Sequence, residues 1–348
     1  MKNRVTYIDF EKGILIINVL IIHLIFIYGE SDILRVLHRL CIPQFALLCG
    51  YNINYSINKP IFKTWLKTIS SIFFIYFWSL LFTYLVFENN CDVKGTLNLM
   101  LMGYFHPKYN MPIWYAPYYI SLWTISILIL KFINFVSYFI GKLLNKDNYF
   151  SYELLLFFAI IFAMLGFSYA GTNQYFIKQA FITIPFVFIG YMLYRLDGLF
   201  DNYIKNINSK EKLIIYIFLV LILIIASIIF YDLSKIGGTV DIAPFIIENI
   251  PNFYITSILG GLSLFVICKL ICSIYVINLI TSIISYIGQK SMYICCFHQI
   301  TQYVVFEYYA PFLNNYNGNM FLSLFLKISI TIITTIVMSY IFEKEKKL

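Results

Sequence analysis

A lysine and a histidine, Lys12 and His23, lie eleven residues apart in the apolar segment YIDFEKGILIINVLIIHLIF. Eleven residues of α-helix make three turns plus about 20°, so both side chains share one face, and His23 lies roughly 16 Å further along the axis. If the segment spans a bilayer with Lys12 near one mouth, His23 lies near the midplane. An ionisable residue at that depth is costly and indicates function. Because imidazole is the usual base near neutral pH, this helix would carry a charge at its mouth and a proton acceptor halfway through.

The composition indicates an integral membrane protein. Of the 348 residues, 61% are hydrophobic and 12% are charged, whereas soluble domains carry about 25% charged residues. We predict an all-α polytopic protein with about ten transmembrane helices, forming a single membrane-embedded domain over residues 1–348. The apolar windows long enough to span a bilayer fall near 13–29, 40–56, 66–87, 114–135, 153–170, 179–195, 212–231, 253–273, 287–306 and 321–342.

The basic residues predict the orientation. Ten spans place both termini on one side, and seventeen of the 25 Lys and Arg residues fall on that side, against six on the other. Because cytoplasmic loops carry the excess of Lys and Arg, we predict that both termini are cytoplasmic. The net charge of +8 is scattered over short loops and forms no patch, so a nucleic-acid partner is rejected. The seven Cys show no CxxC pair and no zinc spacing, so no metal is expected.

Short motifs with polar residues follow one another along the chain. They are Y-x-D-x-x-K-G with His23 in the first window, R-x-x-x-P-x-F with G-Y in HRLCIPQFALLCGYN, the basic pair of FKTWLKTIS, the Trp of MPIWYAPYY, and S-x-Y-x-x-x-x-H in SYIGQKSMYICCFHQI. Their order and spacing resemble acyltransferase family 3, the bacterial integral-membrane O-acyltransferases that act on surface polysaccharides. Three positions depart from the usual pattern of that family: Cys49 replaces a common Ser, Gln44 an apolar residue and Pro112 a frequent His.

The resemblance implies an O-acetyltransferase of the bacterial cell membrane. Its donor would be cytosolic acetyl-CoA, and its acceptor a sugar hydroxyl of a cell-surface polysaccharide or of a lipid-linked precursor. His23 would be the catalytic residue, acting either as a base or as a transient acyl carrier. The residues implied in binding are Lys12, Lys63 and Lys67 for the donor, and Arg39, His298 and Trp114 for the acceptor. Basic residues suit a donor that carries several phosphate charges.

Each assignment has a structural alternative. His23 and His298 are also explained as hydrogen-bonding groups between membrane helices. Lys12 is also explained as a side chain that snorkels to the interface, Lys63 and Lys67 as orientation signals, and Arg39 as an anchor for its helix.

An exporter of polysaccharide is the alternative function. That class would show paired broken helices, and only the Pro43 break is apparent. A structural subunit of an envelope assembly would need no ionisable residue at depth, so His23 argues against it. The sequence leaves open the sugar, the hydroxyl position and the oligomeric state.

Overall fold

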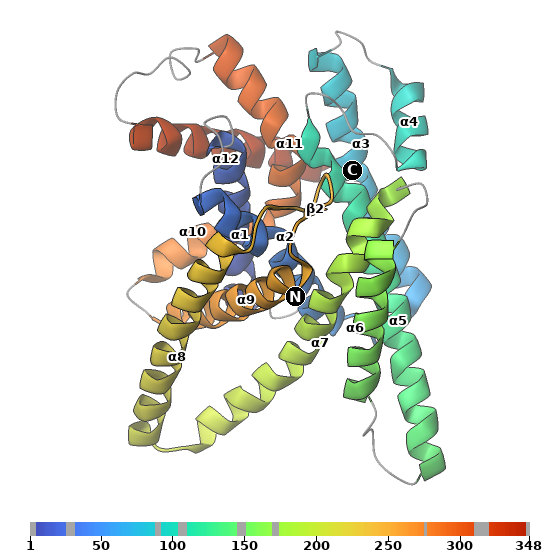
Figure 1. The fold of residues 1–348 in the computed structure, drawn as a ribbon. Coiled ribbons are helices and arrows are strands. Elements are labelled where there is room, and N and C mark those ends of the chain that lie inside the picture. The colour runs from blue at the N-terminus through green and yellow to red at the C-terminus, as the bar shows by residue number, and fades with distance from the viewer. Residues whose placement is uncertain are drawn as a thin grey trace. The chain divides into compact units, whose positions relative to one another are not determined.

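The chain folds almost entirely into helices, as the computed structural model shows (Figure 1). The structure describes residues 5–25, 32–87, 92–103, 110–144, 151–168, 174–274, 277–309 and 320–345. One short antiparallel hairpin, β1 (Val240–Asp241) with β2 (Ile246–Ile247), is the only sheet in these ranges. The predicted all-α class is therefore confirmed.

The contacts divide the chain into two compact units. Unit 1 comprises Met1–Cys41, Ile69–Pro117 and Leu264–Leu348, and unit 2 comprises Ile42–Thr68 and Tyr118–Ser263. Four helices continue along the chain from one unit into the other: α2 (Asp32–Ile53), α3 (Ile61–Phe87), α5 (Tyr115–Leu144) and α9 (Ile250–Cys272). Each unit is described by itself, and the single domain over residues 1–348 stays a prediction.

Unit 1 is built around α1 (Thr6–Ile25), which packs on α10 (Asn278–Gln289), α11 (Ser291–Tyr303) and α12 (Met320–Glu345). Gly13 of α1 and Gly288 of α10 permit this approach, because a Cβ at either position would collide with the backbone of Ile284 or Asp9. Small residues at such interfaces let membrane helices pack closely. Besides parts of the four shared helices, the unit contains α1, α4 (Val93–Met102), η2 (Met111–Trp114), α10, α11, the π-helical η5 (Val304–Tyr309) and α12.

Unit 2 repeats this use of glycine. Gly50 of α2 lies against the backbone of Val187 in α7 (Ile177–Asn206), and Gly190 of α7 lies against the backbone of Leu47 in α2. A capping box at Asn208 starts α8, which satisfies the first free amides of that helix. The elements of this unit, besides parts of the shared helices, are α6 (Ser151–Ser168), η3 (Gln174–Phe176), α7, α8 (Ser209–Ile236), β1 and β2.

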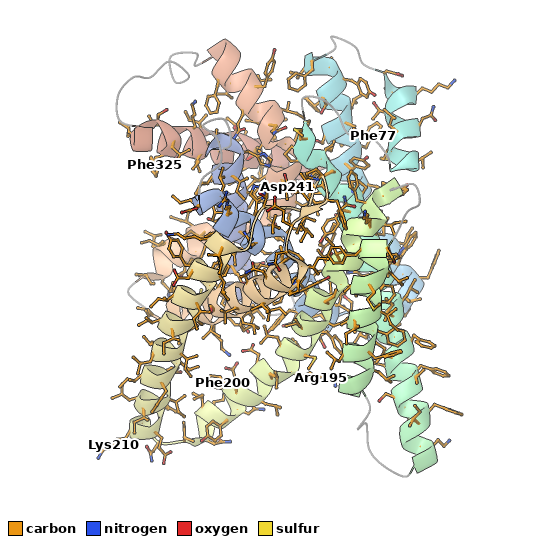
Figure 2. All side chains as sticks on the ribbon, in the orientation of Figure 1. Phe77, Arg195, Phe200, Lys210, Asp241 and Phe325 are labelled. Carbon is orange, nitrogen blue, oxygen red and sulfur yellow. The ribbon has the colours of Figure 1, made fainter. Side chains whose placement is uncertain are left out.

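Seven helical segments within the described ranges are long and apolar enough to cross a membrane. They are Asp32–Ile53, Ile61–Phe87, Met111–Lys142, Ile177–Asn206, Ser209–Ile236, Ile250–Cys272 and Leu322–Tyr340. Large apolar side chains on these helices are exposed. Leu221 on α8 is one example, and Phe325 on α12, labelled in Figure 2, is another. A multi-pass membrane protein is therefore supported, while the count of ten spans and the cytoplasmic termini stay predictions.

Within the described ranges, windows 13–29, 153–170 and 287–306 have no counterpart among these seven segments, and window 40–56 differs in its bounds. Most of window 40–56 lies in one helix that begins at Asp32, continues through Pro43 and ends at Ile53. Window 287–306 is not one helix, because α10 ends at Gln289 and α11 begins at Ser291. The change of helix falls at Gln289, Lys290 and Ser291, three polar residues that the apolar window included.

Candidate active site

The ring of His23 on α1 lies against the ring of His298 on α11. The ring centroids are 5.0 Å apart and the ring planes are inclined at 42°. His298 is fully buried, whereas His23 is half-buried. These two histidines were predicted separately, from opposite ends of the sequence, and the structure places them together within unit 1.

The hydrogen bonds of His298 determine which of its nitrogens is basic. Its Nδ1 lies 3.0 Å from the carbonyl oxygen of Ile294 and 2.9 Å from that of Cys295. Carbonyl oxygens only accept, so Nδ1 carries the proton and donates to them, and Nε2 of the neutral ring keeps a lone pair. Within the described residues this Nε2 is buried and has no hydrogen-bond partner. The α11 backbone thus holds a basic nitrogen to which no group of the described ranges donates.

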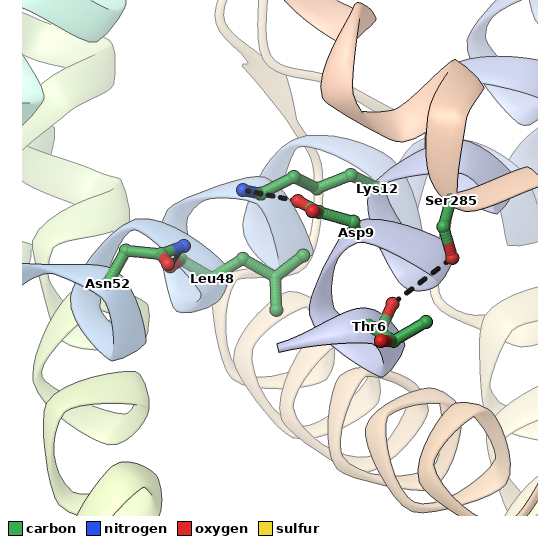
Figure 3. A network of polar contacts seen from close by, with 6 residues as sticks. All are labelled: Thr6, Asp9, Lys12, Leu48, Asn52 and Ser285. Carbon is green, nitrogen blue, oxygen red and sulfur yellow. Dashed lines mark hydrogen bonds and ion pairs between the residues drawn. The ribbon is translucent and has the colours of Figure 1, made fainter. Parts of the chain in front are cut away.

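Lys12 lies on the same helix as His23, three turns earlier, as the spacing predicted. Its Nζ is 3.7 Å from Oδ1 of Asp9, and its side chain is 23% exposed (Figure 3). Ser285 of α10 donates to the carbonyl oxygen of Thr6 at 3.2 Å and anchors the start of α1. Because Asp9 shares the charge of Lys12, a phosphate group bound here would compete with an internal carboxylate.

The other two predicted donor residues, Lys63 and Lys67, are exposed on the first turns of α3. They belong to unit 2, whereas Lys12 belongs to unit 1. Two exposed lysines one helical turn apart on one face suit an anionic ligand. That all three lysines bind one donor molecule stays a prediction.

Arg39 and Trp114, predicted for the acceptor, lie in unit 1 with the two histidines and have other partners in the structure. Arg39 is fully buried on α2, and its Nη1 donates to the carbonyl oxygen of Arg35 at 3.2 Å. Trp114 is buried in η2, edge-to-face with Tyr115 at 6.2 Å between centroids. Since η2 packs against α11, Trp114 belongs to an element that contacts the helix of His298.

Asn110 was not predicted, although it is fully buried beside α11. Its Nδ2 lies 3.1 Å from Oγ of Ser79, 3.0 Å from Oγ1 of Thr83 and 3.2 Å from the carbonyl oxygen of Cys296. The next amide donates to Oε1 of Gln299 at 2.8 Å. These bonds hold the start of η2 against α3 and α11. An asparagine just before a Pro-containing turn is the only signal in the sequence.

A second polar cluster in unit 2 includes Tyr51 of the G-Y motif. Its hydroxyl donates to Oδ2 of the buried Asp197 at 2.8 Å, and its ring packs edge-to-face on Tyr194. Nearby, burial and the neighbouring Tyr194 and Asp197 raise the pKa of Tyr55, which follows the end of α2. The motif tyrosine thus has a structural role in joining α2 to α7.

No three His, Cys, Asp or Glu side chains of the described ranges come together in a way that could hold a metal ion. The site offers two imidazoles in contact, and the Nε2 lone pair of His298 is buried. Such groups can take a proton from an alcohol and return it to a leaving group.

Similarity to known proteins extends over nearly the whole chain. The sequence profile of acyltransferase family 3, described as an acyltransferase domain, matches residues 5–344. An uncharacterised protein of Rickettsia prowazekii (strain Madrid E) is 20% identical over 244 residues, covering 66% of this chain and 95% of that protein. No solved structure matches the chain.

Proposed function

Because the chain belongs to acyltransferase family 3, we propose that this membrane acyltransferase moves an acetyl group from acetyl-CoA to a sugar hydroxyl. The acceptor is a cell-surface polysaccharide or its lipid-linked precursor in the bacterial cell membrane. The observation that carries the proposal is the contact of His23 with His298, whose Nε2 is buried and basic. A structural pair of histidines would be expected to use both ring nitrogens in hydrogen bonds within the protein.

The reaction needs one proton acceptor and one leaving group. His23 takes the proton as the hydroxyl oxygen attacks the thioester carbonyl, and a carbon–oxygen bond forms. The carbon–sulfur bond then breaks, and the CoA thiolate receives the proton from the imidazolium. His23 has the better access of the two rings because it is only half-buried. In the alternative role, His23 itself attacks the thioester and carries the acetyl group before the sugar accepts it.

Binding of the two substrates follows from charge and burial. The exposed Lys63 and Lys67 bind the phosphates of the donor, with Lys12 contributing beside Asp9. Lysine serves as a point charge in such contacts. Trp114 and Arg39 serve the acceptor, Trp114 through the η2 turn that contacts α11.

The test is acetyl transfer by purified protein in lipid nanodiscs. The donor is acetyl-CoA labelled in the acetyl group, and the acceptor is surface polysaccharide from the native cells, freed of ester groups by mild base. Label should enter the polysaccharide with wild-type protein and not with His23→Ala. Absence of transfer by folded wild-type protein, with this acceptor and with lipid-linked precursor, would show that the proposed reaction is wrong.

Mass spectrometry of surface glycans from cells with and without the gene distinguishes an acetyltransferase from an exporter. Loss of an acetyltransferase removes one acetyl mass per repeat and leaves the polysaccharide at the surface. Loss of an exporter removes the polysaccharide itself.

A further inference from the structure

One face of α11 carries three polar side chains within a single turn: His298, Thr301 and Gln302. Positions three and four residues apart lie on the same face of a helix. His298 is 0% exposed and Thr301 5% exposed. Within the described residues, Nε2 of His298, Oγ1 of Thr301 and Nε2 of Gln302 are all buried without a hydrogen-bond partner. We call these three residues the α11 polar face.

Thr301 departs from the other buried threonines of the structure. The described ranges contain eight buried threonines, and seven donate their hydroxyl to a carbonyl oxygen three or four residues earlier in the chain. Those seven are Thr83, Thr96, Thr183, Thr256, Thr281, Thr331 and Thr335. Thr301 does not, although it lies inside α11 with helical carbonyls behind it. A buried hydroxyl without a partner destabilises a fold unless a ligand supplies the bond.

The surroundings of the α11 polar face also indicate a binding site. The helix changes to the π-helical η5 directly after Tyr303. Such π-helical turns occur mostly at functional sites. On the other side, His298 contacts the ring of His23 at 5.0 Å between centroids. The three partnerless atoms therefore share one helical turn with the ring that touches the proposed base.

The chemistry of these atoms defines the ligand. A lone pair, a hydroxyl and an amide N–H together can accept from and donate to hydroxyl groups, which are both donors and acceptors. We propose that the α11 polar face binds sugar hydroxyls adjacent to the one that is acylated. His298 Nε2 accepts a hydrogen bond from a neighbouring hydroxyl while His23 takes the proton of the reacting one. Thr301 and Gln302 bind further hydroxyl oxygens, and the inference rests on the proposed acyl transfer.

This assignment predicts that the acceptor sugar carries hydroxyls on adjacent ring carbons. Hydroxyls on adjacent ring carbons are close enough for two imidazoles at 5.0 Å to bind one each. A buried site built to bind a hydroxyl discriminates strongly against an analogue that lacks it, because its own polar groups are then left unpaired. Thr301 and Gln302 are therefore specificity-determining residues for the acceptor and have no role with the donor.

The experiment uses Thr301→Val and Gln302→Met in full-length protein in nanodiscs, with labelled acetyl-CoA and base-treated surface polysaccharide. Each variant should raise the KM for polysaccharide roughly three- to tenfold, the effect of one hydrogen bond. The KM for acetyl-CoA should not change. The matched control is Thr335→Val on α12, because the Thr335 hydroxyl is equally buried but bonds to the carbonyl oxygen of Thr331. This control should leave both KM values unchanged.

A second threonine variant separates binding from packing. Thr301→Ser keeps the hydroxyl and should keep the KM for polysaccharide close to that of wild type. If Thr301→Ser weakens acceptor binding as much as Thr301→Val, the effect is one of packing and the inference is wrong. It is equally wrong if both Thr301→Val and Gln302→Met bind polysaccharide normally, or if they weaken acetyl-CoA instead. In all these results wild-type protein still transfers acetyl, so only the inference about the α11 polar face is refuted. If wild-type protein transfers no acetyl group, the proposed function itself is refuted.

Discussion

Replacing Asn110 by alanine should loosen the turn that carries Trp114, by an amount that follows from its hydrogen bonds. Nδ2 has only two hydrogens for the three acceptors within 3.0 to 3.2 Å, so two bonds form at a time. After the substitution, Cys296 O still accepts from Ser79 at 2.7 Å, and Thr83 still donates to Ser79 O at 2.8 Å. No partner is left fully unpaired. The loss is therefore two ordinary bonds, about 1–3 kcal/mol of unfolding free energy.

The assay is unfolding of the helical protein in mixed micelles by a denaturing detergent, followed by circular dichroism. Asn134→Ala is the matched control, since Asn134 Nδ2 is half-buried and makes one bond, to the Tyr191 hydroxyl at 3.2 Å. It should cost about half as much, roughly 0.5–1.5 kcal/mol. A double-mutant cycle of Asn110→Ala with Thr83→Val should show a coupling of at least about 0.5 kcal/mol.

Two results would refute this reasoning. One is an Asn110→Ala protein that unfolds like wild type, which would mean that the buried bonds add nothing. The other is strict additivity with Thr83→Val, which would mean that the two side chains do not interact. If the stability falls as expected, the KM for the acceptor should rise with it, because Asn110 fixes the start of η2 against α11.

Three further predictions concern catalysis, the donor and the membrane topology. His23→Ala should leave a folded protein that binds CoA but transfers acetyl about 10²–10⁴-fold more slowly, the usual effect of losing a general base. Near-wild-type turnover would contradict that role. A trapped acetyl-His23 would indicate that the residue is a nucleophile instead. Lys63→Ala or Lys67→Ala should weaken CoA binding by about 1.5–3 kcal/mol where a phosphate contact is lost. Lys12→Ala should weaken it by less, because Asp9 shares the charge of Lys12. Titration calorimetry with CoA measures these affinities, and unchanged affinity in all three variants would contradict the proposed donor contacts. A reporter fused after Leu348 should be active only in the cytoplasm, and activity outside would show that one of the ten spans was miscounted.

The parts of the site that the sequence predicted are those fixed by local periodicity. Lys12 and His23 lie on one helix because their spacing is a property of any α-helix of that segment. The polar motif around His298 identified that residue, but its contact with His23 depends on how α1 packs on α11. The neighbouring contact of α1 with α10 uses Gly13 and Gly288, whose importance appears only once the opposing backbone is known.

The importance of the residues that were not predicted from the sequence depends on whether their polar groups have hydrogen-bond partners in the folded protein. Asn110 and Thr301 look ordinary in the sequence, because asparagine and threonine are common in apolar segments of this chain. Asn110 becomes informative through partners on α3 and α11. Thr301 becomes informative for the opposite reason, since its hydroxyl has no partner within the described residues. Hydrogen-bond satisfaction is a property of the packed structure, so no pattern of residue types predicts it.

The error in window 287–306 and the chemistry of His298 have the same structural origin. The chain ends α10 at Gln289, begins α11 at Ser291 and changes to a π-helix after Tyr303. Within that short helix, the carbonyls of Ile294 and Cys295 hold Nδ1 of His298 and leave Nε2 basic. In a membrane, backbone that departs from a continuous helix is tolerated where it is buried in protein or lines a cavity. The break between α10 and α11 is therefore compatible with a polar site inside an apolar protein, and α11 orients His298 beside the proposed base His23.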